Sequence, residues 1–386
     1  MLRRGLRQKN WDDDTGPMRR RNFLATPALA GFLPAAKAAT ADQRVIATGD
    51  GLSLSPEDYS AALQKQSAGL KPDSYSQGGV VARLEEKVAG ALGKEMAVWL
   101  PTGTLANHLA VRMFAGEKRR VLVQGECHLY NDCGDCCQTL SGLHLVPLAL
   151  GQATFNLQQV EAEAERAASG RVTVPIGAIQ IETPVRRKSG ETFDIGEMKR
   201  ISAWARERKI GMHLDGARLF LASAYSGVPV REYAALFDTV YISMYKYFNS
   251  ASGAVLAGPR NLLENLFHTR RMFGGGLSHV WPFAAVADYY FDGFGERFAQ
   301  AVTASEKVIT GLQADTRVEV SRIPNGTNIF SLRVKRGDPR TFQDRLRKAG
   351  LILGDPQNDQ FLLSVNETWN RIGAQQILDR LQLALT

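Results

Sequence analysis

The sequence predicts an α/β fold in which a mostly parallel sheet is flanked by helices and followed by a smaller α+β C-terminal domain. Short apolar runs near residues 96, 121, 144, 177, 210, 239 and 254 alternate with runs of helical periodicity, which is typical of a parallel sheet covered on both faces. Beyond residue 295 the pattern changes to two strands, a helix, a strand and a last helix. The chain has 386 residues, 44% of them hydrophobic, which suffices for a sizeable core.

These patterns predict three parts of the chain. We expect a leader at residues 1–41, a large domain at 42–295 and a small C-terminal domain at 296–386. The segment 42–79 at the start of the large domain is poorly patterned, and we expect it to form an N-terminal arm.

The leader has the features of a twin-arginine export signal. Arg20 and Arg21 precede Phe23 and Leu24 with one residue between, and a mildly apolar stretch with an Ala-x-Ala site follows. A basic disordered tail is the alternative. The signal predicts a periplasmic protein that the twin-arginine export machinery carries in folded form.

Charge and hydropathy argue against a nucleic-acid-binding protein and against a membrane-anchored protein. Residues 1–38 hold eight Lys and Arg against three Asp, so they account for +5 of the formal net charge of +8. Nucleic-acid binding therefore loses its main support. No run of about 18 apolar residues occurs, so we expect no stable membrane anchor.

A helix start follows the first strand of the predicted sheet. Thr102, Gly103 and Thr104 open an amphipathic run, where free backbone N–H groups, the positive end of the helix dipole and two hydroxyls suit a phosphate. A simple capped helix turn would have the same sequence, so the motif by itself is weak.

All four cysteines lie within eleven residues, close to His128. A lone histidine after a strand is usually structural, and the cysteine spacing lacks the paired C-x2-C halves of a structural zinc site, so we expect no metal. Buried free thiols are the first interpretation, disulfides in an oxidising periplasm the second, and a metal site a distant third. The cysteines are Cys127, Cys133, Cys136 and Cys137.

The central stretch carries the strongest chemical signal. Asp215 and Arg218 follow one apolar strand, and Lys246 follows the next. Polar groups at the carboxyl ends of neighbouring parallel strands meet in one crevice. A lysine that bonds an aldehyde and an aspartate that keeps a pyridine nitrogen protonated are what pyridoxal 5'-phosphate (PLP) requires. Each residue taken singly fits a turn, a surface position or a solvated strand end.

Three motifs together resemble the threonine aldolase and β-eliminating lyase family of PLP enzymes. They are His-Leu-Asp-Gly-Ala-Arg-Leu-Phe at residues 213–220, Ser-Gly-Ala-Val-Leu-Ala-Gly at 252–258 and Arg-Arg-Met-Phe-Gly-Gly-Gly at 270–276. The similarity runs from about Tyr75 to Ser278. It implies PLP fold type I, with a small C-terminal domain of the aspartate-aminotransferase type, and a homodimer or homotetramer.

The resemblance also implies roles for individual residues. Gly103 and Thr104 would grasp the cofactor phosphate, and His128 would stack on the pyridine ring and relay a proton. Arg187 would bind the substrate carboxylate, for which a planar guanidinium is well suited. The chain departs from the family near Leu362, where a second carboxylate-binding arginine is expected and none occurs.

The sequence therefore predicts a PLP-dependent aldolase that cleaves the Cα–Cβ bond of a β-hydroxy amino acid to glycine and an aldehyde. Lys246, His128 and Asp215 would be its catalytic residues. A PLP-dependent β-eliminating lyase or racemase acting on another small amino acid is the alternative. A non-catalytic periplasmic binding protein is a third possibility, which has no need of a cofactor-binding lysine.

Overall fold

The computed structural model describes residues 43–66 and 68–386. The predicted leader lies outside the described residues. None of the helices in the described part is long and apolar enough to cross a membrane.

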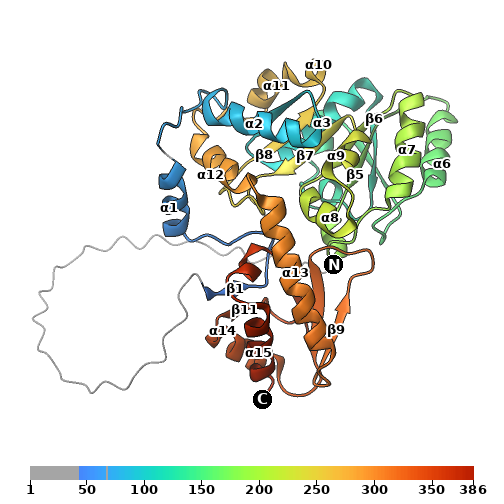
Figure 1. The fold of residues 1–386 in the computed structure, drawn as a ribbon. Coiled ribbons are helices and arrows are strands. Elements are labelled where there is room, and N and C mark those ends of the chain that lie inside the picture. Colours follow the sequence, from blue (N-terminus) through green and yellow to red (C-terminus); the bar gives the residue numbers. More distant parts are fainter. Residues whose placement is uncertain (1–42, 67) are drawn as a thin grey trace, which may run out of the picture. The chain divides into compact units, whose positions relative to one another are not determined.

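A seven-stranded sheet forms the centre of the large domain (Figure 1). Its strand order is β2-β8-β7-β6-β5-β3-β4. The five neighbouring strands from β7 to β4 run parallel, whereas β8 is antiparallel to both β7 and β2. All seven predicted strands are present, and the mostly parallel sheet is confirmed. The strands are β2 (Met96–Leu100), β3 (Arg120–Gln124), β4 (His144–Leu148), β5 (Ile176–Glu182), β6 (Gly211–Asp215), β7 (Thr239–Ser243) and β8 (Ala254–Gly258).

Helices cover both faces of this sheet, which explains why its strands are continuous apolar runs rather than alternating ones. The face that carries Leu122 is packed by α2 (Gly79–Leu92), α6 (Leu157–Ala168), α7 (Ile195–Glu207), α8 (Leu219–Ser226), α9 (Val230–Ala235) and α12 (Trp281–Phe291). The opposite face, which carries Val121 and Val123, is packed by α3 (Gly103–Ala115), α4 (His128–Asn131), α5 (Cys136–Ser141), α10 (Arg260–Leu263) and α11 (Leu266–Met272).

The C-terminal part has its own hydrophobic core and a three-stranded antiparallel sheet of order β12-β10-β9. Three helices pack on it. The elements are α13 (Phe294–Gln313), β9 (Val318–Arg322), β10 (Ile329–Val334), α14 (Pro339–Lys348), β12 (Gln360–Ser364) and α15 (Ala374–Ala384). The predicted domain boundary after residue 295 falls inside α13, which the sequence analysis did not anticipate, and the exact division stays a prediction.

The arm before the large domain connects the two cores. Strand β1 (Val45–Ile46) pairs in parallel with β11 (Leu351–Ile352) of the C-terminal part. The chain then passes the carboxyl ends of the central strands and enters α1 (Pro56–Gln66), which packs near α12. The arm therefore lies where polar residues of the large sheet gather.

Candidate active site

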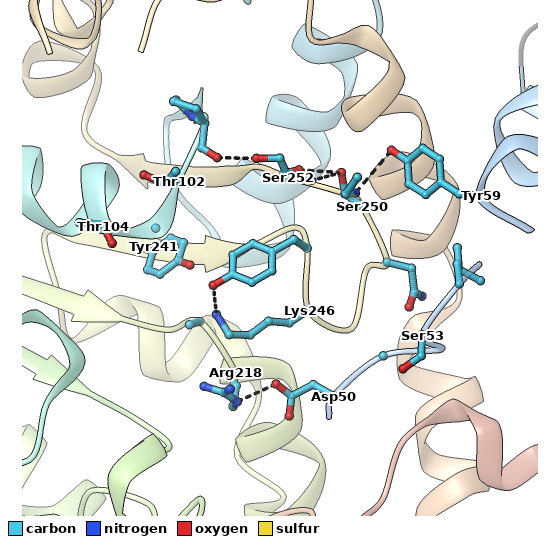
Figure 2. Close-up of a pocket in the computed structure, with 18 of the residues that line it drawn as sticks. Asp50, Ser53, Tyr59, Thr102, Thr104, Arg218, Tyr241, Lys246, Ser250 and Ser252 are labelled. Carbon is cyan, nitrogen blue, oxygen red and sulfur yellow. Dashed lines mark hydrogen bonds and ion pairs between the residues drawn. The ribbon is translucent and has the colours of Figure 1, made fainter. Parts of the chain in front are cut away.

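Six of the seven predicted site residues line one cavity of about 1170 Å3. Its walls come from the arm, from the start of α3, and from the carboxyl ends of β5, β6 and β7. Figure 2 labels side chains from the arm, from the start of α3, from β7 and from the segments that follow β6 and β7. Convergence at this edge is expected, because ligands of open α/β sheets bind outside the carboxyl ends of the strands. The six residues are Gly103, Thr104, His128, Asp215, Arg218 and Lys246.

Asp215 ends a chain of buried hydrogen bonds that the sequence did not reveal. Its side chain is 2% exposed, and its Oδ2 accepts a hydrogen bond from Asn107 Nδ2 at 2.6 Å. Asn107 Oδ1 lies 2.9 Å from Nε2 of His213, whose Nδ1 lies 2.9 Å from Oγ1 of Thr239. Asn107 and His213 are fully buried, so the carboxylate is held by a dry, connected network.

The chemistry of the groups fixes the proton positions in this chain. An amide oxygen only accepts, so His213 must donate from Nε2 to Asn107. Burial lowers the pKa of His213 to about 4, so the ring is neutral at pH 7, and its unprotonated Nδ1 accepts the hydroxyl proton of Thr239. The amide N–H of Asn107 is thereby directed at Asp215, which keeps its other oxygen bonded to the Ala217 N–H at 3.1 Å.

Lys246 lies just beyond β7 in a turn that the arm holds in place. Its Nζ lies 3.1 Å from the Tyr245 hydroxyl and 4.4 Å from the centre of that ring (Figure 2). Asn249 of the same turn accepts a hydrogen bond from the Leu52 N–H at 2.7 Å. A Cβ at Gly51 would collide with the Lys246 carbonyl oxygen, so the arm approaches this closely only because residue 51 is glycine.

A second contact with the arm neutralises Arg218. Its Nε donates to Asp50 Oδ2 at 2.7 Å, and the Arg218 side chain is 18% exposed (Figure 2). The sequence analysis assigned no role to Asp50, which no strand end or motif distinguishes.

The start of α3 forms the predicted anion cradle. Thr102 Oγ1 caps the helix by accepting the Leu105 N–H at 3.2 Å. The N–H groups of Gly103 and Thr104 find no acceptor within the part of the chain that the structure describes, as expected for the first helical positions. A Cβ at Gly103 would collide with the hydroxyl of Tyr241, so only glycine fits between this wall and the helix.

Glu182 holds His128 in place. His128 begins α4, and its backbone N–H donates to Glu182 Oε2 at 2.6 Å. Burial raises the pKa of Glu182 to about 7, and the nearby Asp215 carboxylate adds to this shift. A hydrogen bond with Cys133 raises the pKa of His128, against the opposing effect of burial. The sequence analysis gave Glu182 no function.

Arg187 is the predicted site residue that does not line the cavity; its neighbour Arg186 does. Arg187 faces Asp132, at 3.2 Å from Nη1 to Oδ1, and Glu126, at 3.7 Å from Nε to Oε2. The assignment of Arg187 to the substrate carboxylate therefore stays a prediction, and the geometry gives it no support.

The four cysteines are free in this structure. Cys133 approaches the cavity, where its Sγ lies 3.6 Å from Thr104 Oγ1, whereas Cys127 and Cys137 are fully buried in the core beneath α4 and α5. Among the described residues, no group of three or more His, Cys, Asp or Glu side chains could hold a metal ion.

PLP fits these residues. The unpaired N–H groups at the start of α3 would bind the phosphate, and Asp215 would pair with the protonated ring nitrogen. Lys246 would bond the aldehyde. Each of these groups lines the same cavity.

Comparisons with known proteins agree with this chemistry. A family model described as beta-eliminating lyase matches residues 59–332. A low-specificity L-threonine aldolase of Saccharomyces cerevisiae is 28% identical over 233 residues, which are 60% of this chain and 59% of that protein. An alanine racemase of Cochliobolus carbonum is 28% identical over 229 residues, 58% of each chain. The chain thus spans about three fifths of the length of these curated relatives.

A solved structure extends the similarity over almost the whole chain. A Listeria monocytogenes protein provisionally named L-allo-threonine aldolase has a TM-score of 0.74 and 27% identity, and the match covers 90% of this chain and 97% of that one. The predicted fold class is confirmed.

Proposed function

Because this chain belongs to the beta-eliminating lyase family, we propose that it is a PLP-dependent aldolase that cleaves a β-hydroxy amino acid such as L-threonine to glycine and an aldehyde. One observation carries the proposal: Lys246, Asp215, His128 and the unpaired N–H groups of α3 line a single cavity.

The residues divide the work as follows. PLP, when bound, supplies a ring that accepts the electron pair released as a bond to the substrate α-carbon breaks. Lys246 would hold the cofactor aldehyde and would carry protons. Asp215, oriented by Asn107, would hold the proton on the ring nitrogen. The N–H groups of Gly103 and Thr104 would bind the phosphate.

His128 is the base for the substrate hydroxyl. Its ring lines the cavity, and its backbone is held by Glu182. The hydrogen bond with Cys133 raises the pKa of His128 above its ordinary value, which makes the ring a stronger base. Removal of the hydroxyl proton by this ring drives the Cα–Cβ cleavage.

A second candidate is racemisation or β-elimination, which begins with removal of the α-proton. The identity to an alanine racemase equals that to the yeast aldolase, at 28%. Lys246 and Asp215 would serve this reaction unchanged, with Lys246 as the base.

Product analysis separates these functions. The purified protein loaded with PLP is incubated separately with L-threonine, L-serine and L-alanine. Glycine and acetaldehyde from L-threonine are the expected products. Pyruvate from L-serine, or D-alanine from L-alanine, without glycine from L-threonine would replace the aldolase proposal by elimination or racemisation. A protein that takes up no PLP would favour the third possibility, a non-catalytic periplasmic binding protein.

Export to the periplasm is part of the proposal, and the arginine pair at Arg20 and Arg21 supports it. Cell fractionation of the full chain and of a variant with Arg20→Lys and Arg21→Lys tests this. We expect the wild type in the periplasm and the variant in the cytoplasm; wild type in the cytoplasm would contradict it.

We also propose a homodimer or homotetramer. Exposed apolar side chains support this, since Tyr75, Met272 and Leu277 are 43%, 73% and 39% exposed, and Tyr75 lies under Arg271 at 4.8 Å. Sedimentation should give a mass at least twice that of the chain; a fully active monomer would contradict the proposal.

A further inference from the structure

Two cysteines beside the cavity wall are joined by a C-x-x-C turn. The Cys136 N–H donates to the Cys133 carbonyl oxygen at 3.3 Å, and the residues between them, Gly134 and Asp135, have φ angles of 57° and 52°. Positive φ at both central positions is typical of a type I′ β-turn. The first and last Cα atoms of a β-turn lie within about 7 Å, and a disulfide joins Cα atoms about 4.4–6.8 Å apart. The turn therefore brings the two cysteines close enough to be bridged.

The two thiols also interact directly. Their hydrogen bond is the largest cause of the raised pKa of Cys133, and the same bond lowers the pKa of Cys136, so Cys133 donates and Cys136 accepts. A bond with Cys137 and burial nevertheless raise the pKa of Cys136 to about 12, so it is protonated at pH 7. Cys136 is partly exposed, whereas Cys133 is 9% exposed. Cys136 is therefore the thiol that a reagent in solution meets first.

Cys133 connects this pair to the candidate active site. Its Sγ lies 3.6 Å from Thr104 Oγ1, and its hydrogen bond with His128 is the largest cause of the raised pKa of that histidine. Thr104 and His128 both line the cavity. Asp215 and Asp132 also raise the pKa of His128, and burial opposes them. A change at Cys133 therefore reaches two residues of the cavity wall.

The other two cysteines are poorly placed for a bond of this kind. Cys127 and Cys137 are fully buried, so a reagent in solution does not reach them. Cys136 and Cys137 are successive residues of α5, and successive side chains of a helix point about 100° apart around its axis. Cys133 and Cys136 are therefore the pair that the structure favours.

We propose that Cys133 and Cys136 are a redox-active pair, which an organic disulfide converts to an intramolecular disulfide, and that this bond draws the Cys133 sulfur away from His128 and Thr104. The Cys136 thiolate attacks one sulfur of the reagent, R–S–S–R, and releases R–S⁻. The Cys133 thiolate then attacks the Cys136 sulfur of this mixed disulfide and releases a second R–S⁻. The two protons of the cysteines pass to the released thiolates, and the two electrons that the cysteines lose reduce the reagent.

Closure of the disulfide changes the contacts of Cys133. The two sulfurs approach to about 2.05 Å, much closer than in a pair of hydrogen-bonded thiols. The Cys133 sulfur moves toward Cys136, so its bond with His128 lengthens and the pKa of His128 should fall. The disulfide itself does not depend on the proposed function. Slower cleavage of L-threonine by the oxidised protein, because its base is weaker, rests on that function.

The test treats the reduced, PLP-loaded protein with oxidised glutathione at about pH 8.5, where more thiolate is present, and measures the mass of the chain. The wild type should lose two hydrogen atoms and regain them with dithiothreitol. Cys133→Ser should instead carry one glutathione on Cys136, because the second thiol is missing. Cys136→Ser, the matched variant without the attacking thiol, should keep its mass, and Cys137→Ser should still lose two hydrogen atoms.

The effect on the cavity is read from the pKa of His128, measured by NMR titration of its ring. We expect this pKa to be lower in the oxidised wild type than in the reduced wild type and to return with dithiothreitol. Treatment of Cys136→Ser with oxidised glutathione should leave it unchanged.

Three outcomes would overturn the proposal. They are a wild type that loses no hydrogen atoms, a loss that persists in Cys136→Ser or disappears in Cys137→Ser, and a disulfide that leaves the pKa of His128 unchanged. The proposed function fails in a different way: the oxidised and reduced proteins would still differ in mass and in the pKa of His128, but neither would release acetaldehyde from L-threonine.

Discussion

Replacing Asn107 by leucine would cut the buried hydrogen-bond chain behind Asp215 at its centre. Leucine has the same branched arrangement of four side-chain heavy atoms as asparagine and is somewhat larger, so no cavity is created in this fully buried position. Two bonds are lost: the 2.6 Å bond to the Asp215 carboxylate and the 2.9 Å bond from His213. A bond to a charged group contributes about 1.5–3 kcal/mol, and leaving the His213 N–H unpaired costs about 1–3 kcal/mol more.

The free energy of unfolding of Asn107→Leu should therefore fall by about 2.5–6 kcal/mol. Urea unfolding of the cofactor-free protein measures this, because bound PLP would add its own stabilisation. Thr239→Val is the matched control: it removes only the outermost bond of the chain, to His213, and should cost about 1 kcal/mol. An Asn107→Leu protein within about 1 kcal/mol of wild type would refute the network's importance.

Three further substitutions test other parts of the site and its surroundings. Burial raises the pKa of Glu85 from 4.5 to about 7, so the free energy of unfolding of the wild type falls as the pH rises through this window. In urea titrations between pH 4.5 and 8, the free energy of unfolding of Glu85→Gln should rise by up to about 3 kcal/mol relative to the wild type, and a difference that does not change with pH would contradict this. Cys133→Ala should lower the pKa of His128 in an NMR titration of its ring, because their hydrogen bond is the main cause of the raised value; an unchanged pKa would exclude that cause. Gly51→Ala should lower the free energy of unfolding by about 1–3 kcal/mol, since its methyl group meets the Lys246 carbonyl, and a variant as stable as wild type would show that the arm moves freely.

The sequence predicted those features that depend on local pattern. The strands of the central sheet are buried on both faces, so they are apolar runs that can be recognised without tertiary knowledge. Asp215 and Lys246 follow such runs directly, and the geometry of parallel strands brings them to one edge.

Features that depend on packing were missed. Asn107 is a polar residue in an amphipathic helix and resembles a surface position; it is buried because α3 lies over His213 and Asp215. Arg186 lines the cavity and Arg187 does not, because of the orientation of one short helical turn, Arg186–Lys188. The residue types in this turn do not determine that orientation. Helix α13 was also missed, although its pattern could have revealed it: Phe294, Phe298 and Ala301 recur at helical spacing and are buried on one face.

The most direct test of the account asks whether Lys246 bonds PLP. The purified protein and its Lys246→Ala variant are mixed with PLP, reduced with borohydride, digested and analysed by mass spectrometry. We predict the mass of the reduced cofactor on the peptide containing Lys246 in the wild type, and no such adduct in the variant. An adduct on another lysine in the wild type, or none at all, would contradict the assignment of the cavity.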